Sequence, residues 1–307
     1  FTSPHLQDIR ERITIGGELI SREAFLDAWG DIAPFVDAVD TRSVSEGGPR
    51  MTYFEVLVAL AYTAFADAPV DVAIVEVGLG GVWDATNVAD GKVAVLTPIA
   101  VDHDRYLGST AVAIAHEKVG IIKPGATVLT ALQDDDVMEV IAARCVEVGA
   151  TLLREGVDFG VVSRTPAVGG QIVSIEGLRG RYDDLFLPLY GAHQAQNAVL
   201  ALAAVEELFD NDEPLGADVV SEAFEQVTSP GRLEVVRTSP TIVLDAAHNP
   251  HGLLASATAV REAFTFTKLN LVVGVLRDKD AAEMMRVLVD EYHEFELELW
   301  CTRSQSP

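Results

Sequence analysis

Two side chains that could bind a divalent cation lie at or just after the ends of apolar stretches near the first third of the chain. Glu76 lies in VAIVEV, residues 72–77, just before the glycine turn GLGG, and His103 comes soon after VAVLTPI, residues 93–99. If both stretches are buried strands of an open α/β sheet, both side chains lie at its carboxyl edge, where ligands bind. The carboxylate and the imidazole together indicate a site for Mg²⁺ or Mn²⁺, although Mg²⁺ favours oxygen ligands. Taken singly, Glu76 also fits a solvated strand end, and His103 a structural histidine.

A lysine near the end of a helix-like stretch is a further candidate. The stretch GSTAVAIAHEKVG, residues 108–120, is otherwise rich in Ala, Val and Ile, and Lys118 is one of very few lysines in the chain. Burying a charged ammonium group among apolar residues costs free energy, and burial favours the neutral amine. Lys118 therefore has either a special role or a side chain that extends along the apolar surface to water.

A second group of polar side chains, DAAHNPHG, residues 245–252, follows the apolar stretch TIVL. A strand that ends here presents Asp245, His248 and Asn249 at the start of a helix, and Pro250 occupies a favoured first helical position. Asp and Asn also cap helices without any further role. Capping does not require Asp, His and Asn together, so a functional and a capping interpretation both stay open.

The elements that must position these residues alternate as in an α/β protein. Short β-branched stretches alternate with longer helical ones, which favours a mostly parallel sheet. Besides the strands and the helix already named, we expect a strand at residues 127–132 and helices at 136–149 and 191–209. A small antiparallel insertion is expected between the two helices, with strands at residues 157–163, 170–177 and 182–189.

Pro and Gly in TSPGR, residues 228–232, interrupt regular structure and mark the best linker in the chain. Beyond this linker the alternation restarts, which predicts a second α/β domain. Its strands are expected at residues 241–246, 269–276 and 295–301, and its helices at 250–264 and 281–292. We therefore divide the chain into an N-terminal domain, residues 1–227, and a smaller C-terminal domain, residues 228–307.

The composition indicates a globular protein with room for two domains. The chain has 307 residues, of which 49% are apolar and 22% charged. Its net charge of −25 argues against a nucleic-acid partner, which would need a basic patch. No apolar run reaches membrane-spanning length, no signal peptide opens the chain, and Cys145 and Cys301 lack metal-ligand spacing. These features predict a cytoplasmic protein without a membrane or nucleic-acid partner.

A series of motifs extends along the chain in the order SPHLQDIRERI, EVGLGGVWDATN, DHDRYLG, EKVGIIKPG, HQAQNA, SPGRLEVV and DAAHNPHG. In order and spacing they resemble the folylpolyglutamate synthases, some of which are also dihydrofolate synthases, of the Mur ligase superfamily. The resemblance runs from residue 2 to the DKD at 278–280. It implies an N-terminal Mur-ligase-type ATPase domain, with a mostly parallel sheet and a small antiparallel insertion. It also implies a Rossmann-like C-terminal glutamate-ligase domain.

The resemblance also implies a reaction, in which ATP phosphorylates a carboxylate and an amino acid displaces phosphate from the acyl phosphate. Glu76 and His103 match metal-ligand positions, so two Mg²⁺ ions are expected, with K⁺ as a further candidate cation. Lys118 matches a lysine that reacts with CO₂ to form a carbamate. Carbamylation turns a costly buried cation into an anion that coordinates the second metal, and an apolar setting favours the neutral amine that reacts.

The remaining implied site residues bind the nucleotide and the acceptor. Asn197 and Arg232 match nucleotide-contacting positions, and Asp245 and His248 match C-terminal residues that close on ATP. Lys118, His248 and Asp245 form the expected catalytic set. Ser3, Pro4 and His5 match a loop near the pterin-bearing substrate. The simpler alternatives are a surface ion pair for Arg232 and a turn for Ser3 and Pro4.

The chain departs from the family pattern at both ends and after GLGG. The phosphate-binding loop G-x-x-G-K-[ST] belongs some tens of residues before FTSPHL, and Val82 replaces an arginine expected in many relatives. The chain begins at Phe1 rather than Met, and it ends at TRSQSP within the second domain, where glutamate-binding residues are expected. We therefore expect both ends to be truncated, with the phosphate-binding loop in an upstream segment.

These observations predict an ATP-dependent ligase that adds L-glutamate to the γ-carboxylate of a reduced folate. Dihydropteroate as the acceptor, which yields dihydrofolate, is a sister activity that the sequence does not separate. The alternatives are a Mur-type ligase with another acceptor and a non-catalytic nucleotide- or folate-binding paralogue. Retention of Glu76, His103, Lys118, Asp245 and His248 favours an enzyme, because an inactive paralogue has no chemical need for that set.

Overall fold

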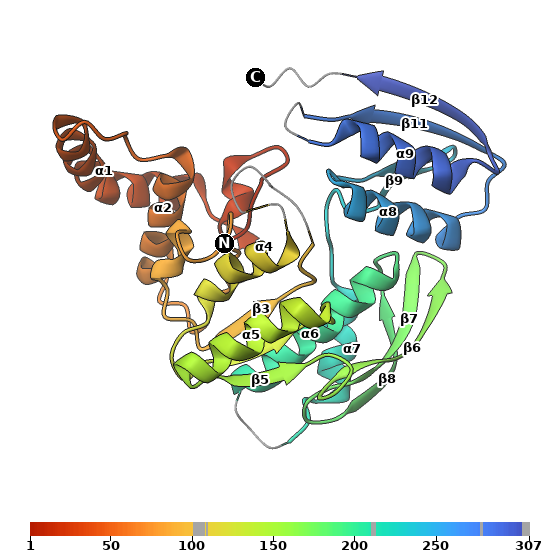
Figure 1. The fold of residues 1–307 in the computed structure, drawn as a ribbon, viewed down its shortest axis with the longest axis horizontal. Helices are drawn as coiled ribbons and strands as arrows, with labels where there is room; N and C mark the ends of the chain where they lie inside the picture. Colours follow the sequence, from red (N-terminus) through yellow and green to blue (C-terminus); the bar gives the residue numbers. More distant parts are fainter. Residues whose placement is uncertain (101–107, 109, 210–212, 277–278, 303–307) are drawn as a thin grey trace.

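The computed structural model describes residues 1–100, 108, 110–209, 213–276 and 279–302. Its elements form two lobes, shown in Figure 1. The N-terminal lobe extends to α7 (Ala217–Glu225), and the C-terminal lobe begins at β9 (Glu234–Thr238). The predicted domain division after residue 227 falls in the connection between these two elements and stays a proposal.

A parallel sheet forms the first layer of the N-terminal lobe. Its strands, in spatial order, are β3 (Val93–Leu96), β4 (Thr127–Thr130) and β5 (Thr151–Arg154). The crossovers between them contain α4 (Ala111–Lys118) and α5 (Asp135–Val148). Ile114, Val128 and Ile141 are almost fully buried and form the core between the sheet and these helices. The predicted α/β class is therefore confirmed, although β3 ends at Leu96, before Pro98, which lacks the N–H that a strand needs.

The predicted antiparallel insertion is also confirmed. The strands of its sheet, in spatial order, are β6 (Gly160–Ala167), β7 (Gly170–Glu176) and β8 (Arg181–Leu187). The long helix α6 (Ala192–Phe209) packs against strands of both sheets. Val199 and Ala203 of this helix share one core with Leu129 of β4 and with Val173 and Ile175 of β7. α6 is thus the element that joins the two sheets of the lobe.

Residues 72–77, expected to be a buried strand, belong to no regular strand, so this prediction was wrong. Their backbone pairs with the first residue of the chain, since Glu76 N donates a hydrogen bond to Phe1 O at 2.9 Å. The side chain of Ile74 is 83% exposed. A pairing with so short a segment forms too few successive hydrogen bonds for a sheet ladder, whatever the β propensity of the residues.

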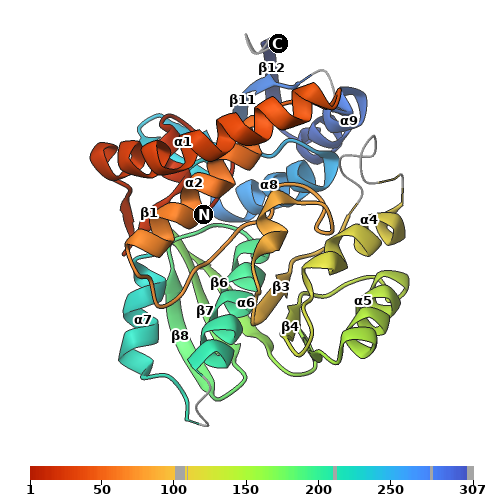
Figure 2. The same cartoon turned by 90° about the vertical axis from the view of Figure 1, so that its left-hand side faces the viewer.

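Two long helices, α1 (Arg22–Ser45) and α2 (Tyr53–Asp67), pack against each other on the side of the lobe that faces the viewer in Figure 2. Before them lie the short helix η1 (Ile9–Arg12) and the strands β1 (Thr14–Ile15) and β2 (Glu18–Leu19). The side chain of Thr52 accepts from Glu55 N while the Glu55 carboxylate accepts from Thr52 N. This capping box fixes where α2 begins. None of these elements was predicted from the sequence.

The C-terminal lobe alternates strands and helices as predicted. After β9 come β10 (Thr241–Leu244), α8 (Pro250–Ala263), β11 (Lys268–Gly274), α9 (Ala281–Tyr292) and β12 (Glu296–Thr302). β11 and β12 are parallel, with Lys268 opposite Glu296, whereas β9 and β10 form an antiparallel hairpin that was not predicted. The core of the lobe is small and centres on Ala257, Leu288 and Tyr292.

A close backbone contact joins the glycine turn after Glu76 to the end of α4. Val82 N donates to Glu117 O at 3.1 Å, and a Cβ on Gly81 would lie 2.4 Å from that carbonyl oxygen. On the other side, a Cβ on Gly120, in the short helix η3 (Val119–Ile121), would lie 2.6 Å from Val82 N. The two segments approach this closely only because both positions lack a side chain. The turn after Glu76 is thereby fixed against the helix that carries Lys118.

A buried carboxylate connects α6 to the antiparallel sheet. Glu206 is 1% exposed and accepts hydrogen bonds from Tyr182 Oη at 2.8 Å and from Leu178 N at 2.6 Å. Leu215 N donates in turn to Tyr182 Oη at 2.9 Å. Burial, followed by the hydrogen bond to Glu206, raises the pKa of Tyr182 to about 12. The phenol therefore stays protonated and holds the carboxylate of α6 against β8.

None of the described helices is both long enough and apolar enough to cross a membrane.

Replacing Gly81 by Ala should destabilise the protein by about 1–3 kcal/mol, because the new methyl group collides with backbone atoms that have no rotamer to change. Urea-induced unfolding followed by circular dichroism measures the effect. Gly91→Ala is the matched control, since a Cβ at Gly91 meets its nearest atom only at 3.9 Å. Equal unfolding midpoints for the two variants would contradict the close contact.

Replacing Tyr182 by Phe should lower the free energy of unfolding at neutral pH by about 1–2 kcal/mol, because Glu206 loses a donor and Leu215 N an acceptor. The stabilisation by Tyr182 should be complete below about pH 10 and lost as the pH rises towards 12, since its pKa in the folded protein lies above that of a free phenol. The half-exposed Tyr53, replaced by Phe, provides the control. A Tyr182 variant as stable as this control would contradict the prediction.

Candidate functional site

Glu76 and the N-terminal residues 2–5 lie in direct contact. Ser3 N donates a hydrogen bond to Glu76 Oε2 at 2.8 Å, and Thr2 Oγ1 donates to the same oxygen. The carboxylate is exposed and offers an anionic oxygen at the molecular surface. The structure therefore brings a predicted metal ligand together with the first residue of the predicted substrate loop.

The rest of that loop is fixed by an arginine. Arg12 Nε donates to His5 Nδ1 at 2.9 Å, so this nitrogen of His5 accepts and carries no proton in the arrangement seen. The guanidinium carbon of Arg12 lies 5.7 Å from the centroid of the Tyr53 ring, at the start of α2. The peptide bond between Ser3 and Pro4 is cis. Residues 2–5 are thus positioned between Glu76 and α2.

Lys118 is the last residue of α4 and is partly buried. The backbone contact of Gly81 and Val82 with Glu117 and Lys118 places it beside the turn that follows Glu76. His103, the other predicted metal ligand, lies outside the described residues. Within the described ranges, no group of three or more His, Cys, Asp and Glu side chains is arranged to hold a metal ion. The oxygen of Glu76 has the chemistry that Mg²⁺ prefers.

Asp245 connects the linker to the start of the C-terminal lobe. Its Oδ2 accepts from Leu233 N at 3.0 Å, and its Oδ1 accepts from Ala247 N at 3.0 Å. Ala246 N donates to Gly231 O at 2.8 Å, and this backbone hydrogen bond joins the linker to the same segment as the Asp245 carboxylate does. The exposed side chain of Arg232 projects from this same turn. The carboxylate therefore holds in one place the segments that carry Arg232 and His248.

His248 and Asn249 follow directly. His248 is exposed, and its Nδ1 lies 3.2 Å from Ala246 O. Asn249 is the N-cap of α8, because its Oδ1 accepts from Gly252 N at 2.7 Å. Asn249 is thus a capping residue, whereas Asp245 bonds with the backbone of the linker and does not cap α8.

The first turn of α6 lies close to this linker. Burial lowers the pKa of His193 below its usual value, the charge of Asp245 raises it, and the positive charges of Arg232, His251 and Arg164 lower it further. These charges act on His193 because they lie near it. Asn197 stands four residues later on α6, so it shares the helix face of His193. Asp245 and Arg232 therefore act electrostatically on the first turn of α6, the helix that carries Asn197.

The N-terminal segment also reaches the C-terminal lobe. Gly231 has a positive φ of 70°, and a Cβ there would lie 3.4 Å from Leu6 Cδ1 and 3.9 Å from Ala246 Cβ. Since Ser3 contacts Glu76, the segment 2–6 extends from the predicted metal ligand to the turn that carries Arg232. It is the physical connection between the two groups of predicted site residues.

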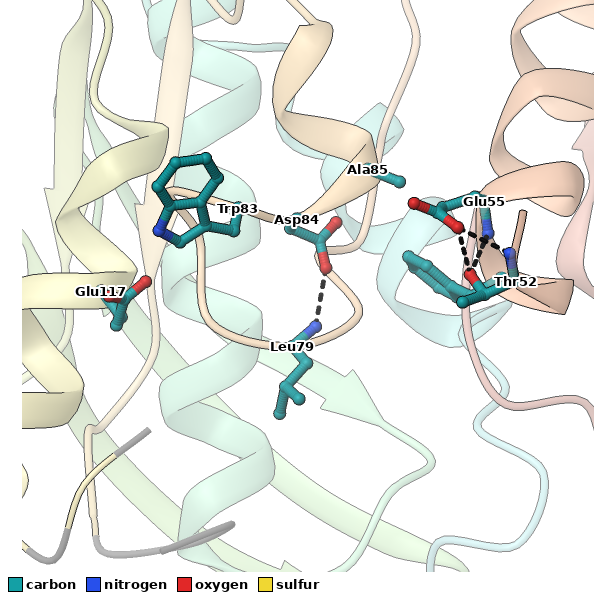
Figure 3. A pocket seen from close by; sticks show the side chains of 8 residues that line it. Thr52, Glu55, Leu79, Trp83, Asp84, Ala85 and Glu117 are labelled. Atoms are coloured by element: carbon teal, nitrogen blue, oxygen red, sulfur yellow. Dashed lines mark hydrogen bonds between the residues drawn. The ribbon is translucent and has the colours of Figure 1, made fainter. Parts of the chain in front are cut away.

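A pocket of about 330 Å³ opens between the start of α2, the turn after Glu76 and the end of α4. Its lining residues are Thr52, Phe54, Glu55, Leu79, Trp83, Asp84, Ala85 and Glu117. Figure 3 shows Trp83 and Glu117 on one side of this pocket and Thr52 and Glu55 on the other. Asp84 Oδ2 accepts from Leu79 N at 2.8 Å and so closes the turn. The pocket offers aromatic faces and carboxylate acceptors.

Several residues of this arrangement were not predicted from the sequence. Thr2 binds Glu76, Phe54 and Trp83 line the pocket, and His193 lies between the lobes. His193 had a usable signal, since it stands four residues before Asn197 in HQAQN. The pocket had no such signal in the sequence, because its walls come from three segments that are distant along the chain.

Known proteins of the family indicated by the sequence motifs are similar to this chain. The profile of the Mur ligase glutamate ligase domain matches residues 231–305. The dihydrofolate synthase/folylpolyglutamate synthase of Mycobacterium tuberculosis is 48% identical over 298 residues, which make up 94% of this chain and 61% of that relative. The chain thus spans about three fifths of the length of this curated relative.

The fold is also similar to that of solved structures over nearly the whole length of the chain. The crystal structure of Mycobacterium tuberculosis folylpolyglutamate synthase complexed with ADP and AMPPCP superposes with a TM-score of 0.93 at 47% identity, covering 100% of this chain and 68% of that one. A folylpolyglutamate synthase complexed with AMPPCP and folate gives a TM-score of 0.86 at 30% identity and covers 99% and 80% of the two chains. The fold, the motifs and these similarities show that the chain belongs to the folylpolyglutamate synthase family of the Mur ligase superfamily.

Proposed function

We propose that the protein containing this chain is an ATP-dependent ligase that joins L-glutamate to the γ-carboxylate of a reduced folate. The observation that carries the proposal is 47% identity, over all of this chain, to a folylpolyglutamate synthase that binds ADP and AMPPCP. The turn that places Arg232 beside Asp245 supports it, because a nucleotide needs polar and cationic groups in one place.

The proposed chemistry has two steps. An oxygen of the acceptor's γ-carboxylate attacks the terminal phosphorus of ATP, ADP leaves, and an acyl phosphate forms. The neutral amine of glutamate then attacks the acyl carbon, loses a proton and expels inorganic phosphate as the amide bond forms. An acyl phosphate hydrolyses readily, so a site enclosed between two lobes favours transfer to the amine over transfer to water.

Asn197, Arg232, Asp245 and His248 are the proposed nucleotide-contacting residues. Arg232 is exposed on a turn whose backbone is held by Asp245 and Gly231, so its guanidinium can reach a phosphate without disturbing the fold. Asn197 is exposed on α6, where its amide Nδ2 donates to Gln194 Oε1 at 3.3 Å and keeps hydrogen-bonding capacity for a nucleotide. Because Asp245 accepts hydrogen bonds from Leu233 N and Ala247 N, we propose that it mainly positions Arg232 and His248.

Glu76, His103 and a carbamate on Lys118 are the proposed ligands of two Mg²⁺ ions, with K⁺ as a further candidate. Mg²⁺ would neutralise charge on the phosphates when bound. Glu76 fits this role because its carboxylate is exposed. Thr2 and Ser3 hold one of its oxygens in a fixed place. Lys118 fits because α4 ends against the turn that follows Glu76.

The pocket beside that turn is the proposed binding site of the pterin ring. A pterin is flat and carries amino and ring N–H donors, which match the faces of Phe54 and Trp83 and the carboxylates of Glu55 and Asp84. Residues Ser3, Pro4 and His5 are then proposed to contact the acceptor nearer its carboxylate, beside Glu76. Dihydropteroate carries the same ring, and a relative named dihydrofolate synthase/folylpolyglutamate synthase supports it as a second acceptor.

The direct test is phosphate release from MgATP by the full-length protein, with L-glutamate and either tetrahydrofolate or dihydropteroate. We expect release that requires glutamate and at least one pterin acceptor, and a product heavier by one glutamate residue in mass spectrometry. If folded protein releases no phosphate with either acceptor, the result would point to a binding paralogue or to a Mur-type ligase with another acceptor.

Replacing Lys118 by Ala should abolish turnover, because the proposed carbamate supplies an anion that the methyl group of Ala cannot. Short carboxylic acids should partly restore activity, and the wild-type protein should show a carbamate signal in ¹³C nuclear magnetic resonance after incubation with labelled bicarbonate. The exposed Lys92, replaced by Ala, is the control and should keep its activity. Near-normal turnover in the Lys118 variant would rule out the carbamate.

A further inference from the structure

The two lobes are joined by an ion pair between β6 and α8. Arg164 of β6 binds Glu262 of α8 through its Nη2, which lies 3.0 Å from Oε1 and 2.8 Å from Oε2. The two side chains are only 20% and 36% exposed. Figures 1 and 2 both show α8 next to α6 and β6, and these elements are in contact. The pair therefore fixes α8 on the N-terminal lobe.

Arg164 also contacts a buried amide in its own lobe. Its Nη1 donates to Gln171 Oε1 at 3.4 Å, and Gln171 is 1% exposed. The Nε2 of Gln171 donates to Leu189 O at 2.8 Å and to Gly191 O at 3.0 Å. These carbonyl groups belong to the segment that leads directly into α6. Since both amide hydrogens of Gln171 are used, its carboxamide has one orientation, which presents Oε1 to Arg164.

The same segment packs against α8. Gly191 has a φ of 94°, and a Cβ there would lie 2.7 Å from Ala259 Cβ on α8. The ring of Tyr190 lies 5.1 Å from that of Phe264, at the end of α8. Gln194 N donates to Gly191 O at 3.1 Å and begins the first turn of α6. The segment 189–191 is thus held between α8 and Gln171.

We propose that Arg164 and Gln171 are positioning residues that couple the placement of α8 to the first turn of α6, through Glu262 on one side and the carbonyl groups of Leu189 and Gly191 on the other. Through this connection the C-terminal lobe holds Arg232 and Asp245 in register with Asn197. The proposal rests on the proposed function for the role of Asn197 in nucleotide binding. The connection itself is defined by the contacts alone.

The test uses Glu262→Gln, Arg164→Gln and the double variant in the full-length protein. Glu262→Gln keeps the shape of the side chain and removes the charge on the surface of α8, so the fold should be retained. Glu291→Gln is the matched control. Glu291 lies on α9 and pairs at 3.2 Å with Arg261, the residue of α8 just before Glu262, so this ion pair stays inside the C-terminal lobe.

We expect Glu262→Gln and Arg164→Gln each to weaken ADP binding, measured by calorimetry, by about fivefold. The double variant should bind no more weakly than Arg164→Gln alone, because each substitution already breaks the Arg164–Glu262 pair. Hydrogen–deuterium exchange at residues 189–197 should become faster in all of them. The control should match the wild type in both measurements.

Unchanged exchange at residues 189–197 in Glu262→Gln would overturn the proposal, as would losses of ADP affinity that simply add in the double variant. Failure of the proposed function has a different signature. In that case the wild-type protein shows no glutamate-dependent phosphate release, while the exchange at residues 189–197 still responds to Glu262→Gln and not to Glu291→Gln.

Discussion

The close approach of two backbone segments constrains the arrangement of the N-terminal lobe. Gly81 and Val82 lie against Glu117, Lys118 and Gly120 at distances that leave no room for a Cβ on Gly81 or Gly120. Because no side chain intervenes, the turn after Glu76 takes its position directly from the end of α4. The pocket is formed at the same contact, since the turn and Glu117 supply two of its walls. One steric requirement thus places the turn after Glu76, Lys118 and the proposed pterin pocket relative to one another.

The C-terminal lobe is attached by polar contacts more than by a shared apolar core. Its core is built from its own residues, such as Leu288 and Tyr292, while the described cores of the other lobe lie elsewhere. The Arg164–Glu262 pair and the packing of Tyr190 on Phe264 hold the interface. Interfaces of this kind are open to rearrangement at small cost in free energy. An enzyme that must admit and then enclose a nucleotide needs such an interface.

Much of this fold could be predicted from local patterns, and the exceptions have physical causes. Periodicity located α5, α6, α8 and α9, because each buries one face along a single core. The stretch 72–77 has a strand's composition but pairs only briefly with the first residues of the chain. The predicted site residues came from motifs, whereas Phe54, Trp83 and Gln171 gain their roles from contacts between distant segments. No spacing along the chain reveals such contacts.

The strand β4 has a consequence for how the protein unfolds. Val128 and Leu129 are consecutive, so they face opposite sides of the sheet, and each is completely buried in a different core. Val128 packs with α4 and α5, and Leu129 packs with α6. The helix that carries Lys118 and the helix that carries Asn197 therefore belong to one cooperative unit, in which neither opens while the other stays packed. Thermal fluctuations that loosen the C-terminal lobe leave this unit, with Lys118 and Asn197 on its helices, intact.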